Sequence, residues 1–286
     1  MAHGLPASAG PSGSASVTVV RDDSLVSVPL KRSVRLDVLL PPGYPATGKL
    51  TPQTGPLPVL YLNDGQDLPR LKLRSIMDSL IQKQEVPPFV IVAIHAGDRI
   101  QEYGTATQAD YLNRGSKAAA YTDFVLTELL PYVQKHYPVT NDPAQSVFAG
   151  FSLGGLSAFD LVWHHPQRFS KAGVFSGSFW WRSKGLDSGY ADETDRIMHS
   201  LVRAGTYQKS LTFWIQTGTD DETDDRDHDG IIDSIDDTLD IIAELERKGY
   251  RWNRDIRYVE VKGGQHNPDT WRRVMPEFLT WAFGVK

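Results

Sequence analysis

Residues 150–154 read Gly-Phe-Ser-Leu-Gly and place Ser152 at the centre of a G-x-S-x-G pattern. An apolar run leads into the pattern and an amphipathic run follows it, as expected of a nucleophilic serine on a sharp strand-to-helix turn. The flanking glycines allow backbone to approach the turn without a Cβ clash. The N–H of Leu153, at the predicted helix start, would then face an oxyanion formed during acyl transfer. The alternative interpretation is an inert serine in a tight turn.

A nucleophilic serine needs a base, and the chain has eight histidines. Only His266 lies in a turn-rich loop after the last predicted strand, with two glycines shortly before it and Asn-Pro after it. This position agrees with the order serine, acid, histidine along the chain. The alternative is a solvated loop histidine.

The third member of such a triad is an acid that holds the imidazole in one tautomer and stabilises its protonated form. Asp220, Asp221 and Glu222 all follow the predicted strand 211–218 and qualify by position. The residues themselves leave all three candidates open.

Immediately downstream, residues 225–236 match the calcium-loop template D-x-D-x-D-G. Gly230 at position 6 permits the sharp turn, and Ile232 at position 8 would anchor the loop. The ligands predicted at positions 1, 3, 5, 7, 9 and 12 are Asp225, Asp227, Asp229, the carbonyl of Ile231, Asp233 and Asp236.

The loop departs from a full EF-hand in two respects. Position 12 is Asp236 in place of glutamate, which shortens its reach, and a predicted strand precedes the loop. We therefore predict an EF-hand-like insertion that binds structural Ca²⁺ and steadies the preceding acids, with no cofactor for the chemistry. A solvated acidic face is the alternative, although carboxylates this close together repel unless a cation neutralises them.

The elements that must position these residues alternate along the chain. Apolar runs bounded by turn residues predict strands at 34–44, 57–65, 89–97, 146–152, 171–177, 211–218 and 256–264. Amphipathic runs predict helices at 70–84, 121–137, 153–165, 236–250 and 268–284, with Pro131 kinking the second or starting a new turn. This alternation predicts an α/β fold with a mostly parallel central sheet and helices on both faces.

The length of 286 residues suits one large domain, and no repeat or linker divides the chain. We predict a single domain at 17–286. Residues 1–16 are rich in Gly, Pro and Ser and predict a flexible tail.

Charge and composition exclude several classes of protein. The net charge of −5 includes ten acids and one base between Asp220 and Asp237, and no basic block indicates nucleic-acid binding. No apolar run approaches the ~18 residues of a membrane span. The absence of cysteine excludes disulfides and thiol nucleophiles. Calcium binding at millimolar affinity would favour a periplasmic or secreted protein, but no signal peptide is visible, so compartment and oligomeric state stay open.

Four stretches carry a resemblance to a known family: YLNDGQD, YTDFVLTELLPYVQKHYP, AGFSLGGLSAFDLVWHHPQRFSKAGVFSGSFWW and GGQHNPDTWRRVMPEFLTW. From about residue 30 to the C-terminus the chain resembles the esterase family of α/β-hydrolases. That family includes enterobactin-type siderophore esterases, feruloyl esterases, S-formylglutathione hydrolases and mycolyltransferases. The resemblance implies the α/β-hydrolase fold. Its G-x-x-D pattern, here residues 218–221, implies Asp221 as the acid, and it places a second oxyanion donor at the N–H of Gln66.

Residues that could contact a substrate lie near these positions. Trp180 and Trp181 follow a predicted strand and would suit aromatic stacking, although adjacent tryptophans are as often packing residues. Arg114 and Arg182 could neutralise an anionic substrate, or each could be a surface arginine. Asp64 could contact a polar substrate or cap its own turn.

The sequence therefore predicts hydrolysis of a small carboxylic ester through an acyl-enzyme, with siderophore, feruloyl or acetyl-sugar esters as possible substrates. One alternative is an acyltransferase that uses the same triad. Another is a non-catalytic calcium-dependent binding module on the same fold.

Overall fold

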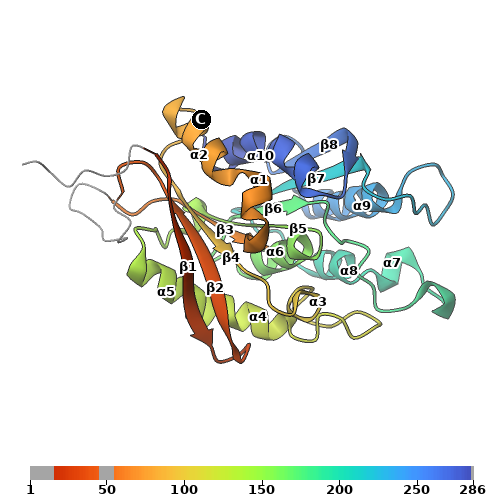
Figure 1. Cartoon of the computed structure of the whole chain (residues 1–286). Coiled ribbons are helices and arrows are strands. Elements are labelled where there is room, and N and C mark those ends of the chain that lie inside the picture. The colour runs from red at the N-terminus through yellow and green to blue at the C-terminus, as the bar shows by residue number, and fades with distance from the viewer. Residues whose placement is uncertain (1–15, 45–54, 285–286) are drawn as a thin grey trace, which may run out of the picture.

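A computed structural model describes residues 16–44 and 55–284 of the chain. All but the last residue of the predicted tail, residues 1–15, lies outside the described residues. Figure 1 shows a central sheet between two layers of helices. The strands are β1 (Thr18–Ser27), β2 (Arg32–Leu40), β3 (Val59–Asn63), β4 (Val90–Ile94), β5 (Ser146–Phe151), β6 (Lys171–Phe175), β7 (Thr212–Asp220) and β8 (Ile256–Gln265).

The α-helices are α1 (Leu68–Leu71), α2 (Leu73–Gln82), α3 (Arg99–Glu102), α4 (Ala118–Phe124), α5 (Leu130–His136), α6 (Leu153–His164), α7 (Asp192–Asp195), α8 (Ile197–Ala204), α9 (Asp233–Lys248) and α10 (Pro268–Phe283). Short 3₁₀ turns are η1 (Gly65–Asp67), η3 (Pro143–Gln145) and η4 (Leu186–Ser188), and η2 (Val125–Leu129) is a π-helical turn.

The eight strands form one sheet in the order β1-β2-β4-β3-β5-β6-β7-β8. The strands from β4 to β8 in this order are parallel neighbours, while β2 runs antiparallel to both β1 and β4. The predicted mostly parallel sheet is confirmed. The carboxyl ends of β3, β5, β6, β7 and β8 therefore share one edge, where open α/β sheets bind ligands.

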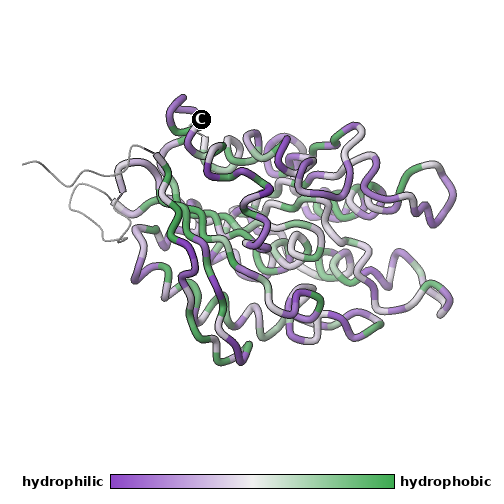
Figure 2. Tube along the Cα trace, in the orientation of Figure 1, coloured by the Kyte–Doolittle hydropathy of each residue, from purple (hydrophilic) through white to green (hydrophobic). Residues whose placement is uncertain are grey.

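Side chains of each central strand alternate between two apolar cores. In β3, Leu60 and Leu62 face the core shared with α1, α2 and α10, whereas Tyr61 faces the core shared with α4, α5, α6, α8 and α9. Every residue of β3, β4 and β5 is buried, as expected for parallel strands covered on both faces. Figure 2 shows this hydrophobic sheet interior with hydrophilic loops around it.

Two features differ from the sequence expectations. Strand β1 was not predicted, because its residues are partly exposed and include charged ones. The predicted helix 121–137 is interrupted by the π-turn η2, after which α5 begins at Leu130 with Pro131 in its first turn. A proline there has no N–H to donate to a preceding carbonyl, which accounts for the break.

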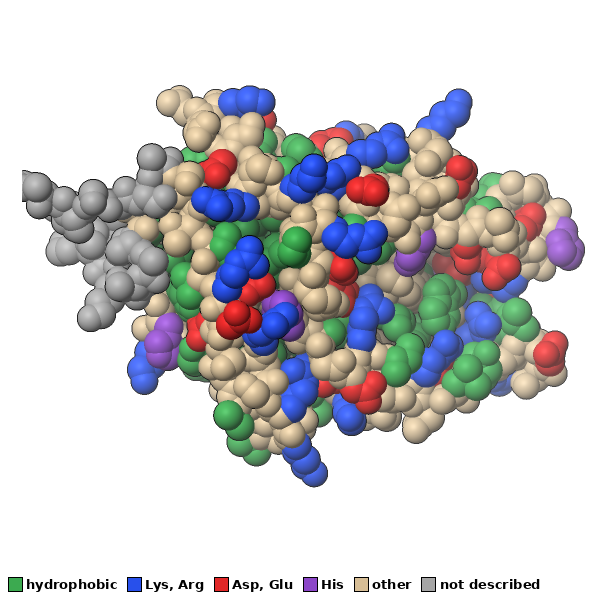
Figure 3. All heavy atoms as spheres, in the orientation of Figure 1, with side chains coloured by type: hydrophobic (Ala, Val, Ile, Leu, Met, Phe, Trp, Pro, Cys, Tyr) green, Lys and Arg blue, Asp and Glu red, His purple; other side chains and the backbone are tan. Residues whose placement is uncertain are grey.

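No helix among the described residues is both long and apolar enough to cross a membrane. Basic and acidic side chains are interspersed over the face shown in Figure 3.

Candidate active site

Ser152 occupies the turn between β5 and α6. Its backbone angles, φ 54° and ψ −122°, are rare for a residue with a side chain, and such strain is concentrated at functional sites. A Cβ on Gly150 would overlap the carbonyl of Gly154, so the turn requires glycine there. The Ser152 N–H donates to the carbonyl of Phe175 at 2.9 Å, which fixes the turn to the end of β6.

The two predicted oxyanion donors follow neighbouring strands. Leu153 is the first residue of α6, where backbone N–H groups have no intrahelical acceptor. Gln66 lies in η1, directly after β3, and Gly65 before it passes so close to β4 that a Cβ would lie 2.8 Å from the Ala93 carbonyl carbon. The Asn63 side-chain amide donates to the Gly154 carbonyl at 2.8 Å and joins the two segments.

Arg99 connects the same two segments. Its Nε and Nη2 donate to the two carboxylate oxygens of Asp64 at 2.8 and 3.0 Å, and Nη2 also donates to the Phe151 carbonyl at 2.9 Å. Asp64 is buried and its backbone is in the left-handed conformation. Its N–H donates a hydrogen bond to the Tyr103 hydroxyl at 3.2 Å. Of the two roles open for Asp64, these contacts support the structural one.

Asp221 is the buried member of the three candidate acids. Its Oδ2 accepts the Gly218 N–H at 3.0 Å, and its Oδ1 is buried with no hydrogen-bond partner among the described residues. Burial raises the pKa of Asp221, while the Gly218 N–H, the Ser176 hydroxyl and the positive charge of His266 oppose that rise. By contrast, Asp220 is exposed. Burial raises the pKa of Glu222, and the charge of Asp233 adds to the rise.

His266 lies between β8 and α10, and its imidazole reaches the surface. Partial burial lowers its pKa, Asp221 raises it, and the positive charge of Arg99 lowers it. The structure thus brings His266 close enough to interact electrostatically with both groups. Its ring packs edge-on against Trp271, with centroids 5.6 Å apart.

Two serines after β6 complete the polar part of the site. Ser178 Oγ lies 3.3 Å from Ser152 Oγ, and Ser176 Oγ accepts the Trp271 Nε1–H at 2.9 Å. Neither serine was predicted, and neither was Arg99. The only local sequence signal for the two serines is the SGS sequence that follows a strand end. Arg99 has no such signal.

A cleft of about 270 Å³ is lined in part by Trp180 and Glu222, which follow Ser178 and Asp221 closely in the sequence. Arg114 contributes to its wall with its guanidinium over the Trp180 ring, 4.9 Å from the centroid, and with Nε donating to Asp110 at 2.6 Å. The full lining is Tyr111, Arg114, Trp180, Arg182, Leu186, Glu222, Asp224 and Asp233.

The adjacent tryptophans have different environments. Trp180 is half-buried in the cleft wall, but Trp181 has no exposed surface. Gly104 and Gly115 pack so closely on the Trp181 ring that a Cβ on either would lie 2.8 Å from it. The expectation that Trp181 contacts substrate is corrected to a packing role.

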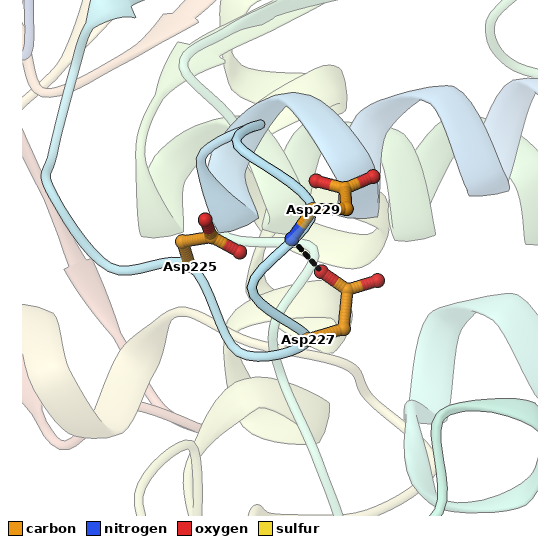
Figure 4. A group of neighbouring side chains, drawn as sticks. All are labelled: Asp225, Asp227 and Asp229. Atoms are coloured by element: carbon orange, nitrogen blue, oxygen red, sulfur yellow. Dashed lines mark hydrogen bonds between the residues drawn. The ribbon is translucent and has the colours of Figure 1, made fainter.

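Three of the six predicted metal ligands lie together. Carboxylate oxygens of Asp225, Asp227 and Asp229 lie within 4.8 Å of one another, and Figure 4 shows the three side chains projecting from one loop. Burial, together with the charges of Asp229 and Asp227, raises the pKa of Asp236 to about 6, which indicates that position 12 is near. This set of oxygen donors suits Ca²⁺.

The remaining predicted ligands have different surroundings. Asp233 pairs with Arg226, which donates from Nη1 at 2.9 Å and from its backbone N–H at 2.8 Å. Ile231, whose carbonyl was predicted at position 7, is an exposed residue. Part of the neighbouring acidic charge is already neutralised, because Arg226 and Arg196 both pair with Asp237.

This fold, with a strained serine turn at the carboxyl edge of a mostly parallel sheet, is the α/β-hydrolase fold. The chain belongs to the family described as "Putative esterase", whose profile matches residues 27–282. Membership supports carboxylic ester hydrolysis as the class of reaction.

Two curated relatives differ in how much of the chain they match. "Uncharacterized protein YbbA" of Bacillus subtilis is 24% identical over 254 residues, which span 87% of this chain and 92% of the relative. "Iron(III) enterobactin esterase" of Escherichia coli K12 is 33% identical over 144 residues, 49% of this chain and 32% of the relative. The alignment with the enterobactin esterase therefore covers about a third of that protein.

Solved structures share the fold. A ferulic acid esterase superimposes with a TM-score of 0.69 at 20% identity, covering 94% of this chain and 98% of that one. The enterobactin esterase of Shigella flexneri, crystallised with 2,3-dihydroxy-N-benzoylserine, gives a TM-score of 0.69 at 24% identity, covering 93% of this chain and 58% of that one.

Proposed function

We propose that the protein is a serine esterase that uses Ser152, Asp221 and His266 through an acyl-enzyme. The observation that carries the proposal is the strained turn at Ser152, on the same sheet edge as the interacting pair Asp221 and His266. A serine held in this conformation presents its hydroxyl at the end of a helix, where backbone donors can stabilise negative charge.

In the proposed reaction, Ser152 Oγ attacks the ester carbonyl carbon and its proton passes to His266 Nε2. The N–H groups of Leu153 and Gln66 stabilise the tetrahedral oxyanion. His266 then protonates the departing alcohol oxygen, which leaves the acyl group on Ser152. Water, deprotonated by His266, attacks the acyl carbon and releases the acid, while the histidine proton returns to Ser152.

Asp221 would accept the Nδ1–H of His266 on Oδ1, the oxygen that has no partner among the described residues. This bond would keep Nε2 free to accept the serine proton. The Gly218 N–H holds the other oxygen and fixes the carboxylate plane. Its burial and its contact with the Gly218 N–H support Asp221 over Asp220 and Glu222.

We propose an aromatic ester as substrate, of the type that the names of the enterobactin esterase and the ferulic acid esterase describe. The cleft supports this choice, because Tyr111 and Trp180 offer ring surface. Aromatic rings stack favourably on such surfaces.

We also propose that the loop 225–236 binds Ca²⁺ through Asp225, Asp227 and Asp229, with Asp236 completing the site. The proposal rests on the match to the calcium-loop template and on the three converging carboxylates. The ion has no part in the reaction. Because the loop begins four residues after Asp221, ordering it would steady the acid.

The decisive experiment is Ser152→Ala, assayed on enterobactin, methyl ferulate and a 4-nitrophenyl ester, with fluorophosphonate labelling followed by mass spectrometry. We expect loss of hydrolysis and of labelling in the variant. Ser188→Ala, at a serine of η4, is the matched control and should behave as wild type. Full activity of Ser152→Ala would overturn the proposal, and products formed with added alcohol would distinguish transfer from hydrolysis.

A further inference from the structure

Arg182 stands out among the charged residues of the cleft. In the parts of the chain that the structure describes, no hydrogen bond or ion pair reaches its guanidinium, and its Nε is buried without a partner. The guanidinium lies between two aromatic rings, 5.5 Å from the centroid of Tyr111 and 5.6 Å from that of Tyr190. The Tyr111 N–H donates to the Arg182 carbonyl at 3.0 Å and holds the backbone in place.

The neighbouring arginines are paired. Arg114, which lines the same cleft, donates to Asp110, and Arg226 pairs with Asp233 and Asp237. Their charges are therefore satisfied inside the protein. Arg182, which also lines the cleft, has no such acidic partner among the described residues.

The cleft wall includes residues that lie close along the chain to the reacting groups. Its wall includes Trp180, two residues after Ser178, whose hydroxyl lies 3.3 Å from that of Ser152. It also includes Glu222, the residue after Asp221. A substrate whose ester carbonyl is at Ser152 would extend from there into this cleft.

The residues of the cleft wall restrict the chemical class of ligand that the cleft can bind. A guanidinium held between two rings presents a planar fork of N–H donors, which matches the two oxygens of a carboxylate. Glu222 and Asp224 on the same cleft would repel a ligand of higher negative charge. Trp180 beside them favours a carboxylate carried on an apolar or aromatic group.

We propose that Arg182 binds a carboxylate of the substrate, so that the enzyme prefers esters carrying one negative charge near the scissile bond. This inference rests on the proposed esterase function and deepens it. The carboxylate belongs either to the acyl part or to the alcohol part of the ester, and the two sources require separate probes.

The test compares matched esters on the full chain. For the acyl part the pair is mono-4-nitrophenyl glutarate and 4-nitrophenyl pentanoate, and for the alcohol part it is 3-acetoxybenzoate and 3-acetoxybenzamide. We expect kcat/KM to favour the charged member of one pair, and Arg182→Met to lower that preference by about 10- to 100-fold through loss of a charge-assisted hydrogen bond. Activity on the neutral esters should be retained.

Two controls separate this effect from unfolding. Arg182→Lys should keep part of the preference, and Arg168→Met, at an exposed arginine outside the cleft, should keep all of it. In wild type, free glutarate or 3-hydroxybenzoate should inhibit competitively. Equal rates on both members of each pair, or equal loss on charged and neutral esters in Arg182→Met, would overturn the inference. Failure of the proposed function would instead appear as no hydrolysis of any ester.

Discussion

Arg99 and Asp64 form a two-point ion pair, with Nε 2.8 Å from Oδ1 and Nη2 3.0 Å from Oδ2. The same Nη2 donates to the Phe151 carbonyl, directly before the serine turn. Arg99 therefore ties the loop that carries Gln66 to the strand that carries Ser152. We expect the relative position of the two predicted oxyanion donors to depend on these contacts of Arg99.

Replacing Arg99 should impair catalysis more than substrate binding. In Arg99→Met the donors at Gln66 and Leu153 lose their common support, and we expect kcat to fall by about 10²–10³, as for loss of one oxyanion donor. Because the charge of Arg99 lowers the pKa of His266, its removal should also move the acid limb of the pH profile to higher pH.

Steady-state kinetics from pH 4 to 9 check both effects for Arg99→Met. Arg70→Met, at an exposed arginine of α1, is the matched control and should leave kcat and the profile unchanged. Unchanged kcat in Arg99→Met would show that the brace has no catalytic role. An acid limb at the same pH as in wild type would show that the charge of Arg99 does not affect the pKa of His266.

The pH dependence of wild type follows from His266. The base must be neutral to accept a proton, and partial burial lowers its pKa, so more acid is needed to protonate it. We expect the acid limb of kcat/KM to have its midpoint below the usual histidine value of about 6.5. A midpoint above that value would contradict the assignment of His266 as base.

Asp221→Asn should abolish most activity. An amide cannot hold the imidazole in the required tautomer, and a comparable change in a serine protease lowers kcat about 10⁴-fold. Since Asp221 raises the pKa of His266, the acid limb of the residual activity should move to lower pH. Asp220→Asn removes the exposed neighbouring carboxylate and should be nearly silent. An equal loss in both variants would reopen the choice of acid.

The fold could be predicted largely because parallel strands are buried on both faces and appear as continuous apolar runs. Strand β1 lacks that signal, since it lies at the sheet edge with polar residues exposed. The only sequence signal for the π-turn before α5 is Pro131. A proline there predicts either a kink or a new turn, and the sequence does not distinguish the two.

The site could be predicted where function imposes a local pattern. Ser152 needs glycines around a strained turn, and His266 lies in a loop rich in turn residues. Arg99 and Ser178 come from separate segments and contact the site only through tertiary packing. The spacing of residues along the sequence does not predict such contacts. Trp180 and Trp181 lie in an irregular segment, so alternation could not reveal which ring is buried.

The two tryptophans give a matched pair of variants. Trp181→Ala should lower the free energy of unfolding by about 3–5 kcal/mol, because a fully buried aromatic ring leaves a cavity. Trp180→Ala should change stability much less and should raise KM for aromatic esters, because its ring lines the cleft. Urea unfolding and kinetics on methyl ferulate check the pair. Equal destabilisation without any change in KM would contradict a substrate contact at Trp180.

Calcium removal should lower the melting temperature if the loop 225–236 binds the ion. A ligand that binds only the folded state, at 100 times its Kd, adds about 2.7 kcal/mol of stability. Scanning calorimetry with EDTA and with added Ca²⁺ measures the effect, and isothermal titration measures binding. Asp227→Asn and Asp229→Asn should abolish both, because each removes one of the converging carboxylates. Asp187→Asn, at an exposed acid of η4, is the control and should respond as wild type. A wild-type melting temperature that does not respond to Ca²⁺ or EDTA would leave a solvated acidic loop as the correct interpretation.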